Sequence, residues 1–158
     1  MGFTLLELIL VMIIICTMLA VAAPNLRGFF SSRQLNNIAD QMSVLCRYAK
    51  DQAVNESVTY RFNIDIMENE YWLSVLDQSQ YRMLKGRFGE KFIIPEDVEL
   101  TFDNVDQDGS CYYLDFTADG YGRQCTIQFE DKANTIALYS RGPCDNFEII
   151  ELYDDEGI

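Results

Sequence analysis

An almost unbroken run of apolar residues opens the chain, from Phe3 to Ala23. It contains one charged residue, Glu7, and neither glycine nor proline. At about 1.5 Å per residue, a helix of this length spans roughly 31 Å, the thickness of the hydrocarbon core of a bilayer. A cleaved secretory signal would instead have a basic start and a shorter apolar run of about 7–15 residues. The pattern therefore favours a transmembrane helix over residues 3–23.

Beyond Pro24, apolar residues recur every three or four positions, which is the period of an amphipathic helix. The clearest members of this series are Leu35, Ile38, Met42, Leu45, Ala49 and Ala53. Polar and basic side chains occupy the opposite face. Pro24 is expected to kink the helix rather than to end it. We therefore predict one long helix that ends near Asn55, with an amphipathic part over residues 24–55 that packs on a domain.

The pattern changes after Asn55 to short segments that are rich in β-branched and aromatic residues, several of them alternating between polar and apolar positions. These segments are SVTYRFNID, EYWLSVLD, KFIIPEDVELTF, CYYLDFT, RQCTIQFED and NTIALYS. MENE, TADGYG and EDKAN are the expected hairpin connections. The tail DNFEIIELYDDEGI alternates at first and is then expected to fray. We predict an α+β fold: a long N-terminal helix packed on an antiparallel β-sheet or β-sandwich-like domain over residues 56–158.

Composition narrows the classes of function. The 158-residue chain has a net charge of −13 and no histidine. Without histidine, neither a Ser/His/Asp nor a Cys/His catalytic group can form, and no Walker or dinucleotide-binding glycine motif is present. Strong negative charge repels nucleic acid and anionic lipid headgroups. We expect neither enzymatic activity nor nucleic-acid binding.

The segment from Gly2 through FTLLELIL to Pro24 closely resembles the N-terminus of type IV pilins and type II secretion pseudopilins. The resemblance implies that a prepilin peptidase cuts between Gly2 and Phe3, that Phe3 is then N-methylated, and that residues 1–2 are the remaining leader. It makes Glu7 the acid at the fifth mature position and Pro24 the helix-kinking proline. The family's leader is usually longer and ends in a basic residue before the glycine, which leaves open a short leader or a start upstream of Met1.

The acid has a physical rationale in this family. A carboxylate inside the hydrocarbon core costs about 2–3 kcal/mol or more, so a partner is expected. Cleavage before Phe3 creates a free amine that can pair with Glu7 of a neighbouring subunit, which relieves both charges and sets the register between helices. The alternative is that Glu7 is protonated or reaches the membrane surface by snorkelling.

The middle of the chain is similar to the GspH/FimT family of minor pseudopilins. In LCRYAKDQAVNESVTYRFNID, Ala49 and Ala53 match the alanines of the family's A-R-x-x-A stretch, and Arg47 or Lys50 matches its basic residue. A second segment, FTADGYGRQCTIQFEDKANTIALYSRGPC, resembles the family's F-x-x-x-G turn, two strands and closing glycine. Its matching residues are Phe116, Gly120, Ile127, Ile136 and Gly142.

This resemblance implies a minor pseudopilin that assembles into the pseudopilus of a type II secretion system for protein export. Its partners would be other pseudopilins or pilins, the prepilin peptidase and the inner-membrane assembly platform. The protein would be a single-pass inner-membrane protein with a cytoplasmic N-terminus and a periplasmic domain. One alternative is a FimT-like minor type IV pilin for DNA uptake or pilus assembly, although Asp145 to Ile158 holds six acids and no base. The other is a membrane-tethered binding module.

A calcium loop is a further candidate site. NVDQDGSCYYLD places Asn104, Asp106, Asp108 and Asp115 at positions 1, 3, 5 and 12 of the loop spacing, with Gly109 at position 6. The segment departs from the motif at both ends and its flanks read as strands. A solvated acidic turn is the alternative to calcium binding.

The chain has five cysteines, of which Cys16 lies in the apolar run. The other four would lie in an oxidising compartment, where one or two disulfides are expected and three pairings are open. We favour a disulfide between Cys111 and Cys125, because they flank one strand–turn–strand unit, and expect Cys46 to be buried and free. Cys144 is the fourth cysteine outside the apolar run.

Overall fold

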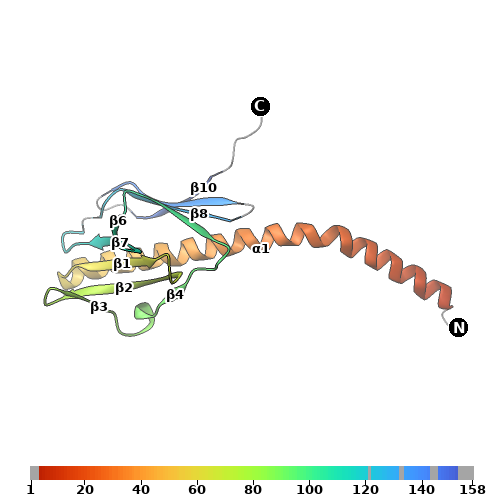
Figure 1. The fold of residues 1–158 in the computed structure, drawn as a ribbon, viewed down its shortest axis with the longest axis horizontal. Helices are drawn as coiled ribbons and strands as arrows, with labels where there is room; N and C mark the ends of the chain where they lie inside the picture. Colours follow the sequence, from red (N-terminus) through yellow and green to blue (C-terminus); the bar gives the residue numbers. More distant parts are fainter. Residues whose placement is uncertain (1–3, 121, 132–133, 143–145, 153–158) are drawn as a thin grey trace, which may run out of the picture.

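In the computed structural model, a single helix, α1 (Leu5–Glu56), is followed by a domain of β-strands. The structure describes residues 4–120, 122–131, 134–142 and 146–152, and only the backbone of residues 21–32. α1 is 52 residues long, with Thr4 as its N-cap and Ser57, in the left-handed conformation, as its C-cap. Figure 1 shows the C-terminal half of α1 lying along the domain and the N-terminal half projecting from it. The predicted end near Asn55 is confirmed.

The strands form two antiparallel sheets. The first sheet, sheet A, has the order β3-β2-β1-β7-β6, with β4 paired to β2; the second, sheet B, has the order β10-β9-β8-β5. The strands of sheet A are β1 (Tyr60–Asp65), β2 (Glu70–Asp77), β3 (Gln80–Met83), β4 (Phe92–Ile93), β6 (Asp106–Asp108) and β7 (Cys111–Phe116). Those of sheet B are β5 (Glu99–Asp103), β8 (Cys125–Glu130), β9 (Thr135–Ser140) and β10 (Glu148–Leu152). A short 3-10 helix, η1 (Arg87–Gly89), precedes β4.

The core forms where the apolar face of α1 meets both sheets. α1 contacts β1 and β7 of sheet A and β8, β9 and β10 of sheet B. The predicted apolar series of the helix is buried throughout: Leu35, Ile38, Met42, Leu45, Ala49 and Ala53. Large side chains from both sheets complete the same cluster, among them Phe62, Tyr71, Ile127 and Phe129. The predicted α+β fold, with an N-terminal helix packed on antiparallel sheet, is confirmed.

Two sequence-based expectations about the strands are wrong. KFIIPEDVELTF is not one strand but β4 and β5, which a turn separates: the amide of Val98 donates to the carbonyl of Pro95 at 3.1 Å. The break follows from Pro95, which has no N–H to continue a ladder. TADGYG is not a hairpin either, because it connects β7 of sheet A to β8 of sheet B. The tail contributes β10 as far as Leu152, and residues 153–158 lie outside the described part of the chain.

Candidate interaction surfaces

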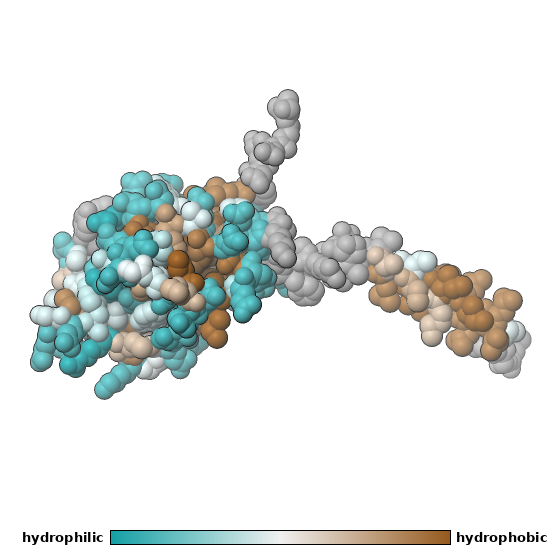
Figure 2. Space-filling model, viewed as in Figure 1, coloured by the Kyte–Doolittle hydropathy of each residue, from teal (hydrophilic) through white to brown (hydrophobic). Residues whose placement is uncertain are grey.

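The N-terminal half of α1 presents apolar side chains to its surroundings in every direction. From Leu5 to Leu19 the large apolar residues are between 44% and 79% exposed. Figure 2 shows this part as a mostly hydrophobic rod set apart from a mostly polar domain. An exposed apolar surface of this extent marks a site that lipid or another protein covers. This half of α1 is the first candidate interaction surface.

Glu7 lies in the first turn of this rod. Its backbone N–H donates to the side-chain oxygen of Thr4 at 3.3 Å. α1 continues without interruption through Pro24, and Figure 1 shows its projecting part curving away from the line of the domain. Gly2 and Phe3 lie outside the described residues, so cleavage between them and pairing of Glu7 with a neighbouring amine stay predictions.

The predicted transmembrane segment covers residues 3–23. The structure does not describe residue 3 or the side chains of residues 21–23. Within the part of the chain that the structure does describe, no helical stretch is both long enough and apolar enough to cross a membrane.

A second candidate surface lies on the face of sheet A that points away from α1. Arg61 of β1 forms two hydrogen bonds to Asp115 of β7, at 2.6 and 2.8 Å. Its guanidinium lies between two aromatic rings, 3.7 Å from the ring centre of Tyr81 and 3.8 Å from that of Tyr113. Partial burial lowers the pKa of Arg61, but the hydrogen bonds and charge of Asp115 outweigh it and raise that pKa overall. The four side chains, with Trp72, are called the outer platform below.

Polar contacts beneath and beside the outer platform connect it to the neighbouring side chains of sheet A. Asn63 and Ser74 are 8% and 3% exposed although they lie on an outward face. The side-chain amide of Asn63 donates to the hydroxyl of Ser74 at 2.9 Å. At the edge, Lys91 pairs with Glu70 and lies 4.9 Å from the ring centre of Trp72. Aromatic and arginine side chains held in fixed positions are typical of protein-binding surfaces.

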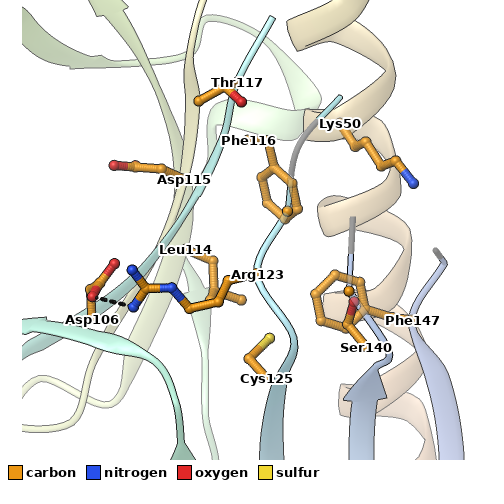
Figure 3. Close-up of a pocket in the computed structure, with 12 residues that line it drawn as sticks. Lys50, Asp106, Leu114, Asp115, Phe116, Thr117, Arg123, Cys125, Ser140 and Phe147 are labelled. Carbon is orange, nitrogen blue, oxygen red and sulfur yellow. Dashed lines mark hydrogen bonds and ion pairs between the residues drawn. The ribbon is translucent and has the colours of Figure 1, made fainter. Parts of the chain in front are cut away.

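A cavity of about 250 Å³ opens where the two sheets separate beside the C-terminal part of α1. Figure 3 shows Lys50 of α1 on one side of it and Cys125 of β8 on the other. Asp106 pairs with Arg123 at 2.7 Å across its opening. The aromatic rings of Phe116 and Phe147 meet edge to face in its lining. Asp106 and Arg123 therefore compensate each other's charge in this lining.

Solved structures show what this architecture is similar to. No protein-family model matches the sequence, and no curated protein is similar to it by sequence. The structure of the minor pseudopilin EpsH from the Type 2 Secretion System of Vibrio cholerae superposes with a TM-score of 0.60 at 12% identity, covering 78% of this chain and 99% of that one. A crystal structure of the same pseudopilin gives 0.57 at 10% identity, covering 80% and 98%. This chain has the minor-pseudopilin fold.

The type IV minor pilin FimU of Pseudomonas aeruginosa has a similar fold, with a TM-score of 0.53 at 14% identity, covering 79% of this chain and 92% of that one. The resemblance to pilin-like proteins that the sequence indicates is thus confirmed at the level of the fold. At these identities the likeness concerns the fold alone.

The residues that matched the GspH/FimT pattern occupy structural positions in this pseudopilin fold. Phe116, Ile127 and Ile136 are buried in the core. Gly120 has a φ of +74°, and a Cβ atom there would lie 3.3 Å from Cγ2 of Val54 on α1. The glycine therefore lets the connection between the two sheets pass close to the end of the helix.

The predicted calcium ligands do not come together. Asp106 pairs with Arg123 and Asp115 with Arg61, while the amide of Asn104 donates to the backbone carbonyl of Gln124. Asp108 ends β6, an extended strand that pairs with β7 rather than curling around an ion. Among the described residues, no three histidine, cysteine, aspartate or glutamate side chains are grouped so that they could hold a metal. The loop spacing in the sequence is therefore not realised as a loop.

The structure does not bring the predicted disulfide partners, Cys111 and Cys125, together. The prediction took β7 and β8 for one hairpin, but they belong to different sheets. Cys111 lies opposite Asp65 on the outer side of β7, whereas Cys125 is buried in the core. Cys46 is buried, as expected. It is a free thiol in this structure, as are the other described cysteines, and Cys144 lies outside the described residues.

Proposed function

We propose that this chain is a minor pseudopilin that assembles into the pseudopilus of a type II secretion system. The observation that supports this most is the combination of a pseudopilin-like domain with a projecting part of α1 whose described large apolar side chains, from Leu5 to Leu19, are exposed. In this proposal residues 3–23 anchor the subunit in the inner membrane before assembly, with the N-terminus in the cytoplasm and the domain exported. The protein acts by assembly rather than by catalysis.

The exposed half of α1 would exchange one apolar environment for another. In the membrane it is covered by lipid, and in the filament by the parallel helices of neighbouring subunits. Because apolar side chains are equally well solvated in both, this exchange provides little preference for any particular axial position. A charged pair between Glu7 and the amine of Phe3 on a neighbouring subunit would provide it, since each charge alone is costly in this environment.

A substitution at Glu7 tests this proposal. Glu7→Val should leave the protein in the membrane fraction but abolish its cross-linking to other pseudopilins in cells. Glu90→Val removes an exposed glutamate from the domain and is the matched control, which should cross-link like the wild type. Normal incorporation of Glu7→Val would rule out the register role.

Processing is tested separately, by mass spectrometry of the protein from its native membranes. We expect a mature chain that begins at N-methylated Phe3, produced by a prepilin peptidase and passed to the inner-membrane assembly platform. An intact bond between Gly2 and Phe3 in the mature protein would contradict this part of the proposal.

A minor type IV pilin is the second candidate, because the fold is also similar to that of the minor pilin FimU. Deletion of the gene distinguishes the two. A pseudopilin is required for release of exported proteins into the culture medium, whereas loss of a minor pilin reduces surface pili or DNA uptake and leaves that release intact.

A further inference from the structure

Two of the thiols are neighbours in the interior of the domain. Cys46 lies on α1 and Cys125 begins β8, and they are 0% and 1% exposed. Both belong to the core cluster in which α1 meets the sheets. Burial raises the pKa of Cys46, and the proximity of Cys125 raises it further. The helix and the strand that carry them, α1 and β8, are in direct contact.

The cavity beside β8 supports the same placement. Lys50 lies one helical turn after Cys46, and it lines the cavity together with Cys125. Figure 3 shows Lys50 on α1 and Cys125 at the start of β8 among the side chains that line the cavity. The part of α1 that follows Cys46 and the beginning of β8 therefore border the same cavity. The cavity of about 250 Å³ also leaves Cys125 room to change its rotamer.

Cys111 is a poor partner for either thiol. Its strand, β7, directs Leu114 and Phe116 into the core. Side chains alternate between the two faces of a strand, and Cys111 is an odd number of residues from both, so it faces outward. Its sulfur contacts the backbone carbonyl of Tyr112 at 3.7 Å, and Asp65 and Asp108 lie near it. Of the cysteines that are described in the domain, Cys46 and Cys125 are the two that share its interior.

We propose that Cys46 and Cys125 form a disulfide that ties α1 to sheet B in the exported protein, an inference that rests on the proposed extracytoplasmic location of the domain. The two thiols lose two electrons and two protons to the disulfide of a thiol oxidoreductase in that compartment. Its disulfide is reduced to two thiols, and the new S–S bond joins the two cysteines. Because both thiols are enclosed in the folded domain, the bond forms during folding, before the helix closes over the sheet.

Such a bond would matter for a filament subunit. Force applied along α1 reaches the domain through the packing between the helix and the sheets. A covalent link between α1 and β8 would hold the helix on sheet B when that packing is strained. It would also close a long loop, which stabilises the folded domain by restricting the unfolded chain.

The test uses full-length protein in detergent. One sample is purified from native membranes, and another is denatured, reduced and refolded in a buffer of reduced and oxidised glutathione. Free thiols are alkylated before non-reducing digestion and mass spectrometry. We expect a peptide pair joined through Cys46 and Cys125 in both samples, with Cys111 alkylated.

The outcomes separate this inference from the proposed function. Alkylation of both Cys46 and Cys125 in the refolded sample, or a link from Cys125 to Cys144 instead, would overturn the pairing. A Cys46–Cys125 link in the refolded sample but free thiols in the native one would support the pairing and contradict export of the domain.

Stability provides an independent measurement. Reductant should lower the melting temperature of the oxidised wild type by roughly 10 °C, as expected for a disulfide that closes a long loop. The same reductant should not shift Cys46→Ala or Cys125→Ala. Cys111→Ala is the matched control and should respond like the wild type. An unchanged melting temperature of the wild type on reduction would contradict the disulfide.

Discussion

Arg61 and Asp115 lie directly opposite each other on β1 and β7 and form two parallel hydrogen bonds, at 2.6 and 2.8 Å. Their side chains are 19% and 30% exposed, so water screens the pair only partly. The rings of Tyr81 and Tyr113 hold the guanidinium from either side, and the Tyr81 hydroxyl donates to Asp115 at 3.2 Å. This pair connects three strands of sheet A on its outer face.

Substitution of Arg61 by lysine should destabilise the domain although the charge is kept. Lysine cannot form the two parallel hydrogen bonds, nor can it stack as a planar group between two rings. We expect Arg61→Lys to lower the free energy of unfolding by about 1–2 kcal/mol, measured by urea denaturation and circular dichroism. The control is Arg82→Lys, whose partner Asp77 forms a pair that is 61% and 46% exposed. It should change the value by at most about 0.5 kcal/mol. Equal effects of both variants would contradict a special role of the Arg61 site.

Gly120 and Gly109 form a second matched pair. Both have positive φ, +74° and +63°, but a Cβ at Gly120 would meet Val54, whereas one at Gly109 meets nothing within 4 Å. Each alanine variant loses about 1 kcal/mol from the backbone conformation. Gly120→Ala should lose roughly 1 kcal/mol more, because the added methyl presses against the helix. The double variant with Val54→Ala should recover that additional loss; its persistence would show that the contact with the helix is not the cause.

The burial of the Tyr71 hydroxyl predicts a loss of stability of the folded domain at alkaline pH. It is fully buried, its hydroxyl donates to the side-chain oxygen of Gln41 at 2.8 Å, and burial raises its pKa to about 12. Between pH 10 and 12 the unfolded chain releases this proton while the folded chain keeps it. The free energy of unfolding therefore falls as pH rises, by about 1.4 kcal/mol per pH unit for this group.

The comparison that isolates Tyr71 is Tyr71→Phe, because other groups also titrate in this range. Urea midpoints should be measured from pH 8 to 11.5 for both proteins. We expect the variant to be less stable at pH 8, since Gln41 loses its partner, but to have the shallower decline above pH 10. Parallel declines would show that Tyr71 does not contribute.

The sequence identified the helix and its buried face because that signal is local. An apolar residue every three or four positions needs only one neighbouring surface, and residues such as Leu35 and Met42 are buried as their spacing predicts. The strands with alternating or apolar-rich sequence were found for the same reason. β3 was missed because all four of its residues are exposed, so it carries no burial pattern.

What the sequence could not provide is the pairing of elements that are distant along the chain. The outer platform depends on the register that sets Arg61 opposite Asp115 and brings Tyr81 alongside, and alternation in β1 indicates only that Arg61 faces outward. The disulfide prediction failed at the same step: proximity of Cys111 and Cys125 in sequence suggested a hairpin, whereas the chain crosses between sheets there. The candidate calcium ligands are separated for the same reason: Asp115 pairs with Arg61 of β1, and Asp106 pairs with Arg123 in the connection before β8.

The exposed half of α1 predicts how the protein behaves when membranes are extracted. If this half lies in a bilayer, as we propose, the protein should stay in the membrane pellet through washing with alkaline carbonate. Leu8 and Met12 are both 57% exposed in this half. An arginine at the centre of a spanning helix costs about 2.5–3.5 kcal/mol, so the double variant Leu8→Arg with Met12→Arg should be extracted.

The control carries arginine at Val44 and Val54, which are 43% and 48% exposed on the domain-bound half of α1, and should stay in the pellet. Extraction of the wild type, or equal extraction of both double variants, would contradict a membrane role for the projecting half.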